Sequence, residues 1–351
     1  MAGEMNHDPV DGQNGRTGLG GQLRKAEIPM PAAGSSMMRQ TMDRQAAALA
    51  AILADTAPVA AVADRLRGRR ILAVGTGTSW HAACQAAALL RAAGLDADAA
   101  QSADAAVDGP LPGAGAVLLA FSHTGAKQYT ARAAARARAQ GADIVQISGV
   151  GVADADLKTV QQERSSAYTA SHLGALARAA QLAQALGADL PRLGDVPDAV
   201  ERAYRDEPTD AALAPPPRRL IEFTGGGINQ WTAAEGALKI REAAYVASEG
   251  LAVEQFLHGP SVAIGHDDRL VCLDGGGSWS ARIEQVADAA ESAGAAVTRV
   301  TWTDLGELLS IFPLTAAVQR IALEAAEALG VNPDSFGLDL PGHDAWDRID
   351  L

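Results

Sequence analysis

The stretch Arg70-Ile-Leu-Ala-Val-Gly-Thr-Gly-Thr-Ser79 decides the fold class. It is a short apolar run that ends in a turn rich in Gly and hydroxyl groups, and an Ala-rich helical pattern follows to about Ala93. The same order recurs when the apolar run 116–121 leads into Ser122-His-Thr-Gly125, a second helical pattern and the apolar run 143–147. Strand, polar turn, helix, strand predicts a parallel sheet with helices on both faces.

The pattern returns in the C-terminal half. Arg219-Leu-Ile-Glu-Phe-Thr leads into Gly225-Gly-Gly227, and Arg269-Leu-Val-Cys-Leu leads into Asp274-Gly-Gly-Gly-Ser278. The run 295–301 closes this second unit. The strands that begin at Arg70 and Arg219 are separated by a domain length rather than by the short period of a solenoid. We therefore expect two similar α/β domains.

Proline-rich and aperiodic segments suggest the boundaries. Pro208 and Pro215-Pro-Pro217 mark a linker between the halves, and a last helix is expected from about Leu314 to Leu329. The predicted organisation is a disordered tail (1–36), N-terminal helices (37–68), domain 1 (69–203), a linker (204–217), domain 2 (218–338) and a C-terminal tail (339–351).

Composition excludes several classes of protein. The 351 residues carry 29 Lys and Arg against 42 Asp and Glu, a net charge of −13 that argues against a nucleic-acid surface. There is neither a run of about twenty apolar residues nor the order of a signal peptide, so we expect a cytoplasmic protein without membrane association. Cys84 and Cys272 lie in apolar sequence and are expected to be buried thiols. The His and Cys residues have no ligand spacing, so no metal or other cofactor is expected.

Two turns could bind an anion. Gly75-Thr-Gly-Thr-Ser79 and Ser122-His-Thr-Gly125 each lie where a strand ends and a helix begins, so their hydroxyls and N–H groups face a positive helix end. Lys127 would add a positive charge. The alternative is a pair of ordinary capping turns with a solvated lysine, and the turns alone leave both interpretations open.

The segment 232–249 is apolar nearly all round, which predicts a buried helix. On such a helix Glu235, Lys239, Glu242 and Glu249 fall within an arc of about 80°. Buried charges need partners, so this arc suggests a functional cluster. The alternative is an exposed stripe of ion pairs, with Glu235 and Lys239 four residues apart.

These motifs together resemble the signature of sugar-isomerase (SIS) domain proteins. The resemblance is carried by Glu235-Gly-Ala-Leu-Lys-Ile-Arg-Glu242, by Glu249 and by Phe256-Leu-His-Gly-Pro260, with Phe312-Pro-Leu and Asn332-Pro-Asp similar to the end of the family. It covers about residues 37–338 and is strongest to the isomerase half of glucosamine-6-phosphate synthase and its stand-alone relatives. It implies two tandem flavodoxin-like SIS domains that bind a sugar phosphate and form a homodimer with shared active sites.

The resemblance also implies roles for individual residues. Glu242 would move a proton between sugar C1 and C2, His258 of the partner subunit would assist ring opening, and Lys239 would orient the sugar. Glu235 and Glu249 would support this group. Thr78, Ser79, Ser122, His123 and Thr124 would hold the phosphate. Gly77 and Lys127 are predicted to bind it as well, although the family commonly has a Thr at the place of Lys127.

The sequence also departs from the synthase. The segment before the first domain is expected to be too short for a glutamine-amidotransferase domain. The synthase has a lysine near its C-terminus that forms a Schiff base with the ketose, whereas this sequence has no Lys after Lys239. In the tail, His343 and Asp344 could contact a substrate, or the tail could simply be solvated.

The expected activity is that of an amino-sugar-6-phosphate deaminase and isomerase, of the glucosamine 6-phosphate to fructose 6-phosphate type. Two alternatives remain: a deglycase that splits a fructosamine-type 6-phosphate, and a non-catalytic sugar-phosphate sensor. Retention of Glu242 and His258 favours an enzyme, because a sensor needs only the phosphate-binding turns.

Overall fold

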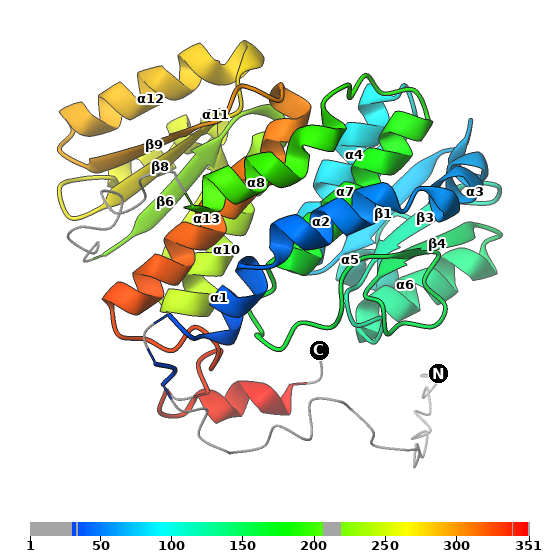
Figure 1. Ribbon diagram of the computed structural model, residues 1–351, viewed down its shortest axis with the longest axis horizontal. Helices are drawn as coiled ribbons and strands as arrows, with labels where there is room; N and C mark the ends of the chain where they lie inside the picture. The colour runs from blue at the N-terminus through cyan, green and yellow to red at the C-terminus, as the bar shows by residue number, and fades with distance from the viewer. Residues whose placement is uncertain (1–29, 33, 206–218, 339, 350–351) are drawn as a thin grey trace, which may run out of the picture.

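Two parallel sheets lie side by side in the computed structural model, which describes residues 30–32, 34–205, 219–338 and 340–349 (Figure 1). The first sheet has the order β2-β1-β3-β4-β5, with strands β1 (Ile71–Gly75), β2 (Ala97–Gln101), β3 (Val117–Phe121), β4 (Asp143–Ser148) and β5 (Leu157–Lys158). The second has the order β7-β6-β8-β9, with strands β6 (Ile221–Gly225), β7 (Ser248–Ala252), β8 (Arg269–Asp274) and β9 (Ala296–Thr301). The predicted α/β architecture with two parallel sheets is confirmed.

The strand order is flavodoxin-like and defines where a ligand can bind. In the first sheet β1 pairs with β2 on one side and β3 on the other, so the chain changes direction of winding between β1 and β3. In the second sheet β6 lies in the same way between β7 and β8. Ligands of open parallel sheets bind beyond the carboxyl ends of the strands at such switch points.

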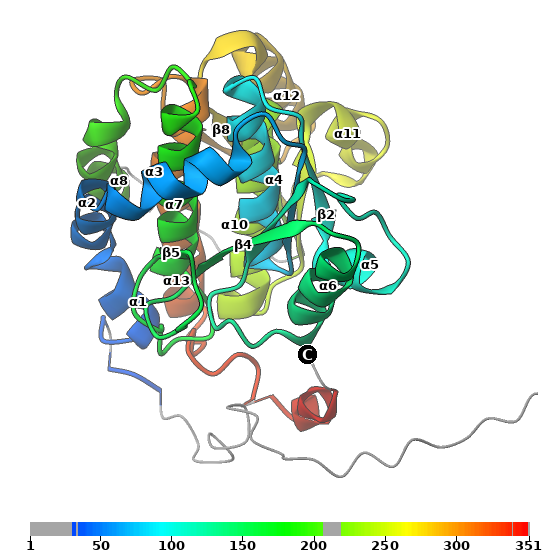
Figure 2. The same cartoon turned by 90° about the vertical axis from the view of Figure 1, so that its right-hand side faces the viewer.

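Helices cover both faces of each sheet (Figure 2). The helices between the two sheets share one continuous apolar core, and they include α4 (Thr78–Ala92), α7 (Ala170–Ala185), α10 (Gln230–Ala244) and α13 (Glu307–Ala328). The outer faces are covered by α5 (Ser102–Val107) and α6 (Gln128–Ala139) on the first sheet, and by α11 (Val253–Leu257) and α12 (Ser280–Ser292) on the second. The core between the sheets therefore places α4 of the first domain against α10 of the second.

Helices near the N-terminus connect the two halves. The N-terminal helices predicted over 37–68 are α1 (Met37–Met42), α2 (Gln45–Ala54) and α3 (Ala57–Leu66). The backbone N–H groups of Met37 and Met38 donate to the Asp334 carboxylate at 2.6 and 2.9 Å, and Arg39 pairs with Glu327 at 2.6 Å. Helix α8 (Val196–Arg205) packs against both α2 and α13. Segments almost 300 residues apart in sequence are thus joined.

Two helix boundaries differ from the sequence prediction. The helix expected over 232–249 ends at Ala244, because Tyr245 adopts the left-handed conformation with φ 58°, and Glu249 lies on strand β7 instead. The last helix begins at Glu307 rather than near Leu314, and Pro313 lies buried inside it. Helix α13 is long and apolar enough to cross a membrane, but 83% of its most apolar window is buried in the protein.

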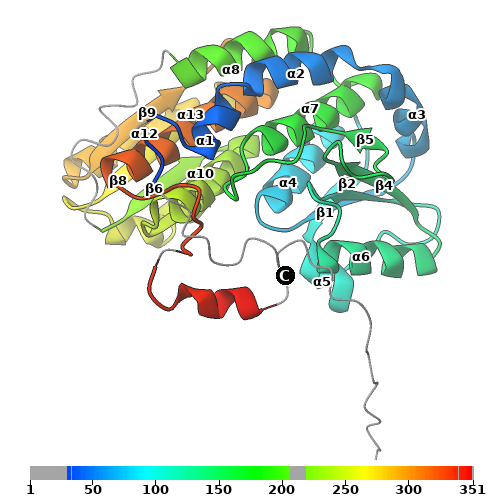
Figure 3. The same cartoon turned by 60° about the horizontal axis from the view of Figure 1, so that its bottom comes forward.

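The remaining predictions on organisation have different outcomes. Cys84 and Cys272 are buried free thiols, as expected, and burial raises the pKa of each to about 12. Most of the predicted tail 1–36 and linker 204–217 lies outside the described residues, and the proposed domain boundaries stay predictions. Figure 3 shows that the short helix η6 (His343–Arg348) lies away from the two domains.

Candidate active site

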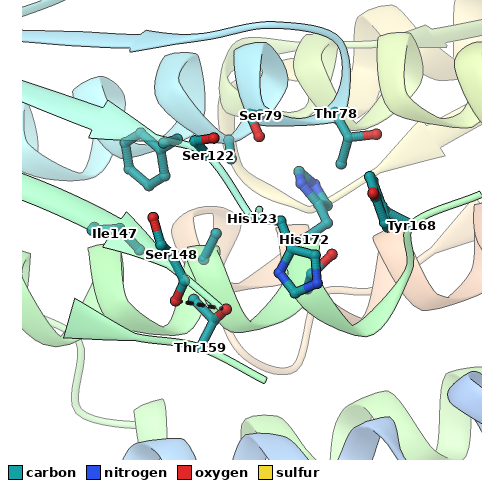
Figure 4. Close-up of a pocket in the computed structure, with 13 residues that line it drawn as sticks. Thr78, Ser79, Ser122, His123, Ile147, Ser148, Thr159, Tyr168 and His172 are labelled. Carbon is teal, nitrogen blue, oxygen red and sulfur yellow. Dashed lines mark hydrogen bonds between the residues drawn. The ribbon is translucent and has the colours of Figure 1, made fainter. Parts of the chain in front are cut away.

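A pocket lies at the switch point of the first sheet (Figure 4). The turn after β1 lets helix α4 begin close to the strand: Gly77 has φ 57°, and a Cβ on Gly75 would collide with the Ser79 carbonyl group. Only glycine fits such a turn without strain. The residues that line the pocket are Thr78, Ser79, Ala82, Phe121, Ser122, His123, Ile147, Ser148, Thr159, Tyr168, Ser171, His172 and Ala175.

Several polar atoms of this pocket have no hydrogen-bond partner within the described part of the chain. They are Ser122 Oγ, His123 Nδ1 and both ring nitrogens of His172. Ser122 is 4% exposed and His172 is 2% exposed. Buried polar groups without partners are costly, so their concentration at one switch point indicates a place for a polar ligand.

The pocket is narrow. Space for a water-sized molecule is about 20 Å³, less than a small-molecule site needs. The His123 and Tyr168 rings pack edge to face across it, with centroids 5.2 Å apart. His123 Nε2 also accepts a hydrogen bond from the Glu163 N–H at 3.2 Å. Binding of a sugar phosphate therefore requires side chains such as these to move.

A buried charged cluster adjoins the pocket, formed by Glu235, Lys239 and Glu242 on α10 with Thr78 and His81 on α4. His81 Nδ1 lies 2.6 Å from one oxygen of Glu235, and Thr78 Oγ1 donates to the other oxygen at 3.1 Å. Lys239 Nζ lies 3.5 Å from Glu235 and bonds directly to Glu242. Glu235 and Lys239 have no exposed surface, so the predicted cluster is buried rather than an exposed stripe.

The surroundings shift the pKa of each charged group. Burial alone would raise the pKa of Glu235, but Lys239 and the two nearby imidazoles lower it to about 2. Burial alone would lower the pKa of Lys239, and the carboxylates of Glu235 and Glu242 outweigh it and raise the value. The pKa of Glu242 is raised, because burial outweighs the ammonium beside it. Burial lowers the pKa of His172 to about 4, so its imidazole is neutral near pH 7.

The structure brings together only some of the predicted residues. Thr78, Ser79, Ser122 and His123 line the pocket, and Glu235, Lys239 and Glu242 form the cluster beside it. The exposed Gly77 precedes α4 without lining the pocket.

The other predicted residues lie elsewhere. Thr124 bonds to the Ala126 N–H within its own turn at 3.3 Å, and Lys127 is exposed before α6. Glu249 is exposed on β7, so it is not part of the cluster. The His258 side chain is 79% exposed at the end of α11, with its ring 3.7 Å from Glu254. Neither His343, which is exposed, nor any other described tail residue lines the pocket, and the Asp344 side chain lies outside the described residues.

Sequence reasoning missed several residues of this region, among them His81, Glu163, Tyr168 and His172. Glu163 accepts hydrogen bonds from the N–H groups of Thr169, at 3.0 Å, and Ser171, at 2.7 Å, and so caps helix α7. Tyr168 and His172 enter the pocket from this long connection and helix. His81 lies three residues after Thr78 on helix α4, so it shares a helix face with Thr78. This spacing was the one signal in the sequence that could have identified His81. Among the described residues, no group of three or more His, Cys, Asp or Glu side chains could hold a metal ion.

The arrangement matches solved structures over nearly their whole length. The C-terminal domain of glucosamine-fructose-6-phosphate aminotransferase from Francisella tularensis superposes with a TM-score of 0.74 at 15% identity, over 86% of this chain and 98% of that one. The chain has the double sugar-isomerase (SIS) fold. A glucosamine-6-phosphate deaminase from Thermotoga maritima shares this fold, with a TM-score of 0.68 at 16% identity over 88% and 98% of the two chains.

Sequence comparison leads to the same group of proteins. The glutamine-fructose-6-phosphate aminotransferase (isomerizing) of Pyrococcus horikoshii is 28% identical over 250 residues, which are 65% of this chain and 42% of that protein. The chain spans 35% to 56% of the length of the curated relatives it matches. No protein-family model matches it. The SIS-domain resemblance is therefore supported by both sequence and fold.

Proposed function

We propose that this SIS-fold protein is an enzyme that isomerises a sugar phosphate. The observation that carries the proposal is the position of Thr78, which lines the pocket of unpartnered polar groups and also bonds to the buried Glu235 of the charged cluster. A binding pocket for an anion and a carboxylate–ammonium cluster therefore meet at one residue. A sugar phosphate, with a phosphate at one end and an acidic C–H bond at the other, has the two chemical features that such a site needs.

Phosphate would bind through neutral donors. None of the described residues that line the pocket is a Lys or Arg. The donors on offer are hydroxyls such as Ser79 and Ser122 and the N–H groups at the start of α4, where the helix dipole favours negative charge. This supports the predicted phosphate roles of Thr78, Ser79 and Ser122, and it leaves Lys127 as a peripheral charge.

Glu242 is the proposed base. Its raised pKa makes its carboxylate a better proton acceptor than an ordinary glutamate, and catalytic carboxylates are tuned in this way. The ammonium group of Lys239 beside it would stabilise negative charge on the sugar oxygen while the proton moves. Glu235, with its lowered pKa, stays ionised and holds Lys239 in the charged form.

The finer proposal is deamination of an amino-sugar 6-phosphate. In the open-chain form of glucosamine 6-phosphate, Glu242 would take the C2 proton and return it to C1, which converts the aldehyde and amine into an imine at C2. Water then hydrolyses the imine to fructose 6-phosphate and ammonia. The similarity to a glucosamine-6-phosphate deaminase and to aminotransferases supports this substrate class. So does the absence of lysine from residues 240–351, since a substrate that carries its own nitrogen needs no enzyme amine for the imine.

A substrate panel tests this proposal. Purified protein is incubated with glucosamine 6-phosphate, with a fructosamine-type 6-phosphate and with fructose 6-phosphate in D2O. We expect ammonia release from the first and deuterium exchange next to the carbonyl. If only the fructosamine-type 6-phosphate reacts and releases a free amine, the protein is a deglycase. If only fructose 6-phosphate exchanges deuterium, the protein is a simple isomerase. Binding of all three without any turnover would contradict an enzyme and favour a sensor.

A homodimer with shared sites is proposed as the working assembly. His258 is 79% exposed, and Val262, four residues further, is the most exposed large apolar side chain of the described residues at 89%. An exposed imidazole next to an exposed apolar side chain suits contact with a second subunit. Mixing inactive Glu242→Gln with inactive His258→Ala protein should then restore part of the activity, because some heterodimers hold one intact site. No recovery after verified subunit exchange would contradict shared sites.

A further inference from the structure

The Thr78 hydroxyl has two competing uses. In the described conformation it donates to Oε1 of Glu235 at 3.1 Å across the interface between α4 and α10. The same side chain lines the pocket where the phosphate is proposed to bind. A hydroxyl group has one proton, so it can donate fully to only one acceptor at a time. Phosphate and Glu235 are both anions that need that donor.

We propose that Thr78 couples phosphate binding to the charged cluster by transferring its hydrogen bond from Glu235 to the phosphate. This proposal rests on the proposed function, since it requires that an anion enters the pocket. Thr78 acts here as a positioning residue: it reaches the proton-transfer group only through Glu235.

The contacts of Glu235 determine how the cluster responds to this transfer. Without the Thr78 donor, Glu235 keeps His81 at 2.6 Å and Lys239 at 3.5 Å. When a buried carboxylate loses one hydrogen-bond donor, its interactions with the remaining donors become stronger. The Lys239 ammonium shifts toward Glu235, which weakens its bond to the neighbouring Glu242. Glu242 is thereby freed as a base only when the phosphate end of a substrate is in place.

Nuclear magnetic resonance of the His81 ring can detect this transfer without any turnover. His81 touches Glu235 directly and is not part of the pocket lining, so its ring resonances respond to changes in Glu235. The probe is inorganic phosphate, titrated into the full chain labelled at histidine, with His81 assigned from a His81→Gln variant. We expect the His81 resonances to shift along the same binding curve as the pocket residue His123.

Three variants separate coupling from binding. Thr78→Val has nearly the same shape without the hydroxyl, and the His81 shift should be lost while phosphate still binds with affinity reduced by less than about tenfold. Thr78→Ser should restore the shift. Ser79→Ala is the matched control, because Ser79 lines the pocket without bonding to Glu235, and it should weaken phosphate binding and keep the His81 response.

Each failure has a distinct meaning. A His81 shift that persists in Thr78→Val, or one that is absent from the native protein although phosphate binds at His123, overturns the coupling and leaves the proposed function intact. If phosphate does not perturb His123 at any concentration, the phosphate site itself is wrong and both proposals fail.

Discussion

The carboxyl ends of the two sheets have the same topology, but one forms a pocket and the other is filled by side chains of the protein. At the first sheet, the switch point holds a pocket with unpartnered buried polar groups. At the second, the protein fills the same place itself: a Cβ on Gly226 would collide with the Trp279 ring, and Gly227 and Gly277 both lie against the Glu307 carboxylate. The glycine-rich turns of the second sheet thus leave room for the protein's own side chains rather than for a ligand.

Several donors at the second switch point already bond to acceptors within the protein. Gln85 donates to Thr232 at 3.0 Å, Thr232 to Asn229 at 3.0 Å, and Asn229 to Ser310 at 2.8 Å. A network whose donors are already used has little to offer a phosphate, and the Glu307 carboxylate would repel it. Fold similarity between the two domains therefore does not imply two binding sites, because function depends on the groups at the site.

The largest expected effect comes from removing the carboxylate of Glu242, which lies in the cluster beside the pocket of the first sheet. Glu242→Gln keeps the shape of the side chain and loses proton acceptance, so kcat should fall by about 10² to 10⁴. The matched control is Glu307→Gln at the second switch point, which should change kcat by less than about twofold. Steady-state kinetics and solvent deuterium exchange at sugar C2 provide the measurement. Equal losses in the two variants would contradict the assignment of the site to the first sheet.

The next largest effect is expected from replacing one serine at each switch point, Ser122 at the first and Ser310 at the second. Ser122 Oγ has no partner within the described chain, so Ser122→Ala should leave stability almost unchanged while KM rises by about 10- to 100-fold through the lost phosphate contact. Ser310→Ala should do the reverse, because Asn229 loses its acceptor: about 1–2 kcal/mol of stability is lost and KM is unaffected. Chemical denaturation and kinetics on the same samples check both. A normal KM for Ser122→Ala would remove it from the phosphate site.

The smallest effect concerns strand β6. Glu222, its second residue, is buried where the equivalent strand β1 has Leu72, and burial with the nearby Glu249 and Asp268 raises its pKa to about 7. A raised pKa means that the folded state holds the proton more tightly, so this stabilisation is complete below about pH 4.5 and is lost as pH rises through 7. Glu222→Gln should therefore be more stable than the native protein at pH 8, by about 1 kcal/mol after allowance for solvent screening. Melting curves at pH 5 and pH 8 test this, and an equal change at both values would contradict it.

Local signals predicted the strands and turns that build the first switch point. The runs that end at Gly75 and Phe121, and the hydroxyls that come after them, are adjacent in sequence, so pattern and helix geometry were sufficient. The grouping of Glu235, Lys239 and Glu242 also follows from helical spacing alone. Glu249 was misplaced because the helix ends at a left-handed Tyr245, a conformation that tertiary contacts impose and that tyrosine rarely adopts.

The rest of the site could not be predicted from local sequence. His172 and Tyr168 reach the pocket from a connection and helix whose path is determined by packing between the two sheets. The sequence also did not show that the second switch point is filled. Asp274-Gly-Gly-Gly-Ser278 resembles an anion-binding turn, and only the fold places the Glu307 carboxylate against it.

The bonds from Met37 and Met38 to Asp334 have a consequence for synthesis of the chain on the ribosome. Domains generally fold as units in the order of their emergence, with the N-terminal one first. Here helix α1 is the first described element to emerge, yet its N-terminal N–H groups find their acceptor only after some 300 further residues have been made. At about 5–20 residues per second this interval is roughly 15–60 seconds. Until then helix α1 lacks these acceptors, and Met38 and Met42 lack the part of their core that the C-terminal half supplies.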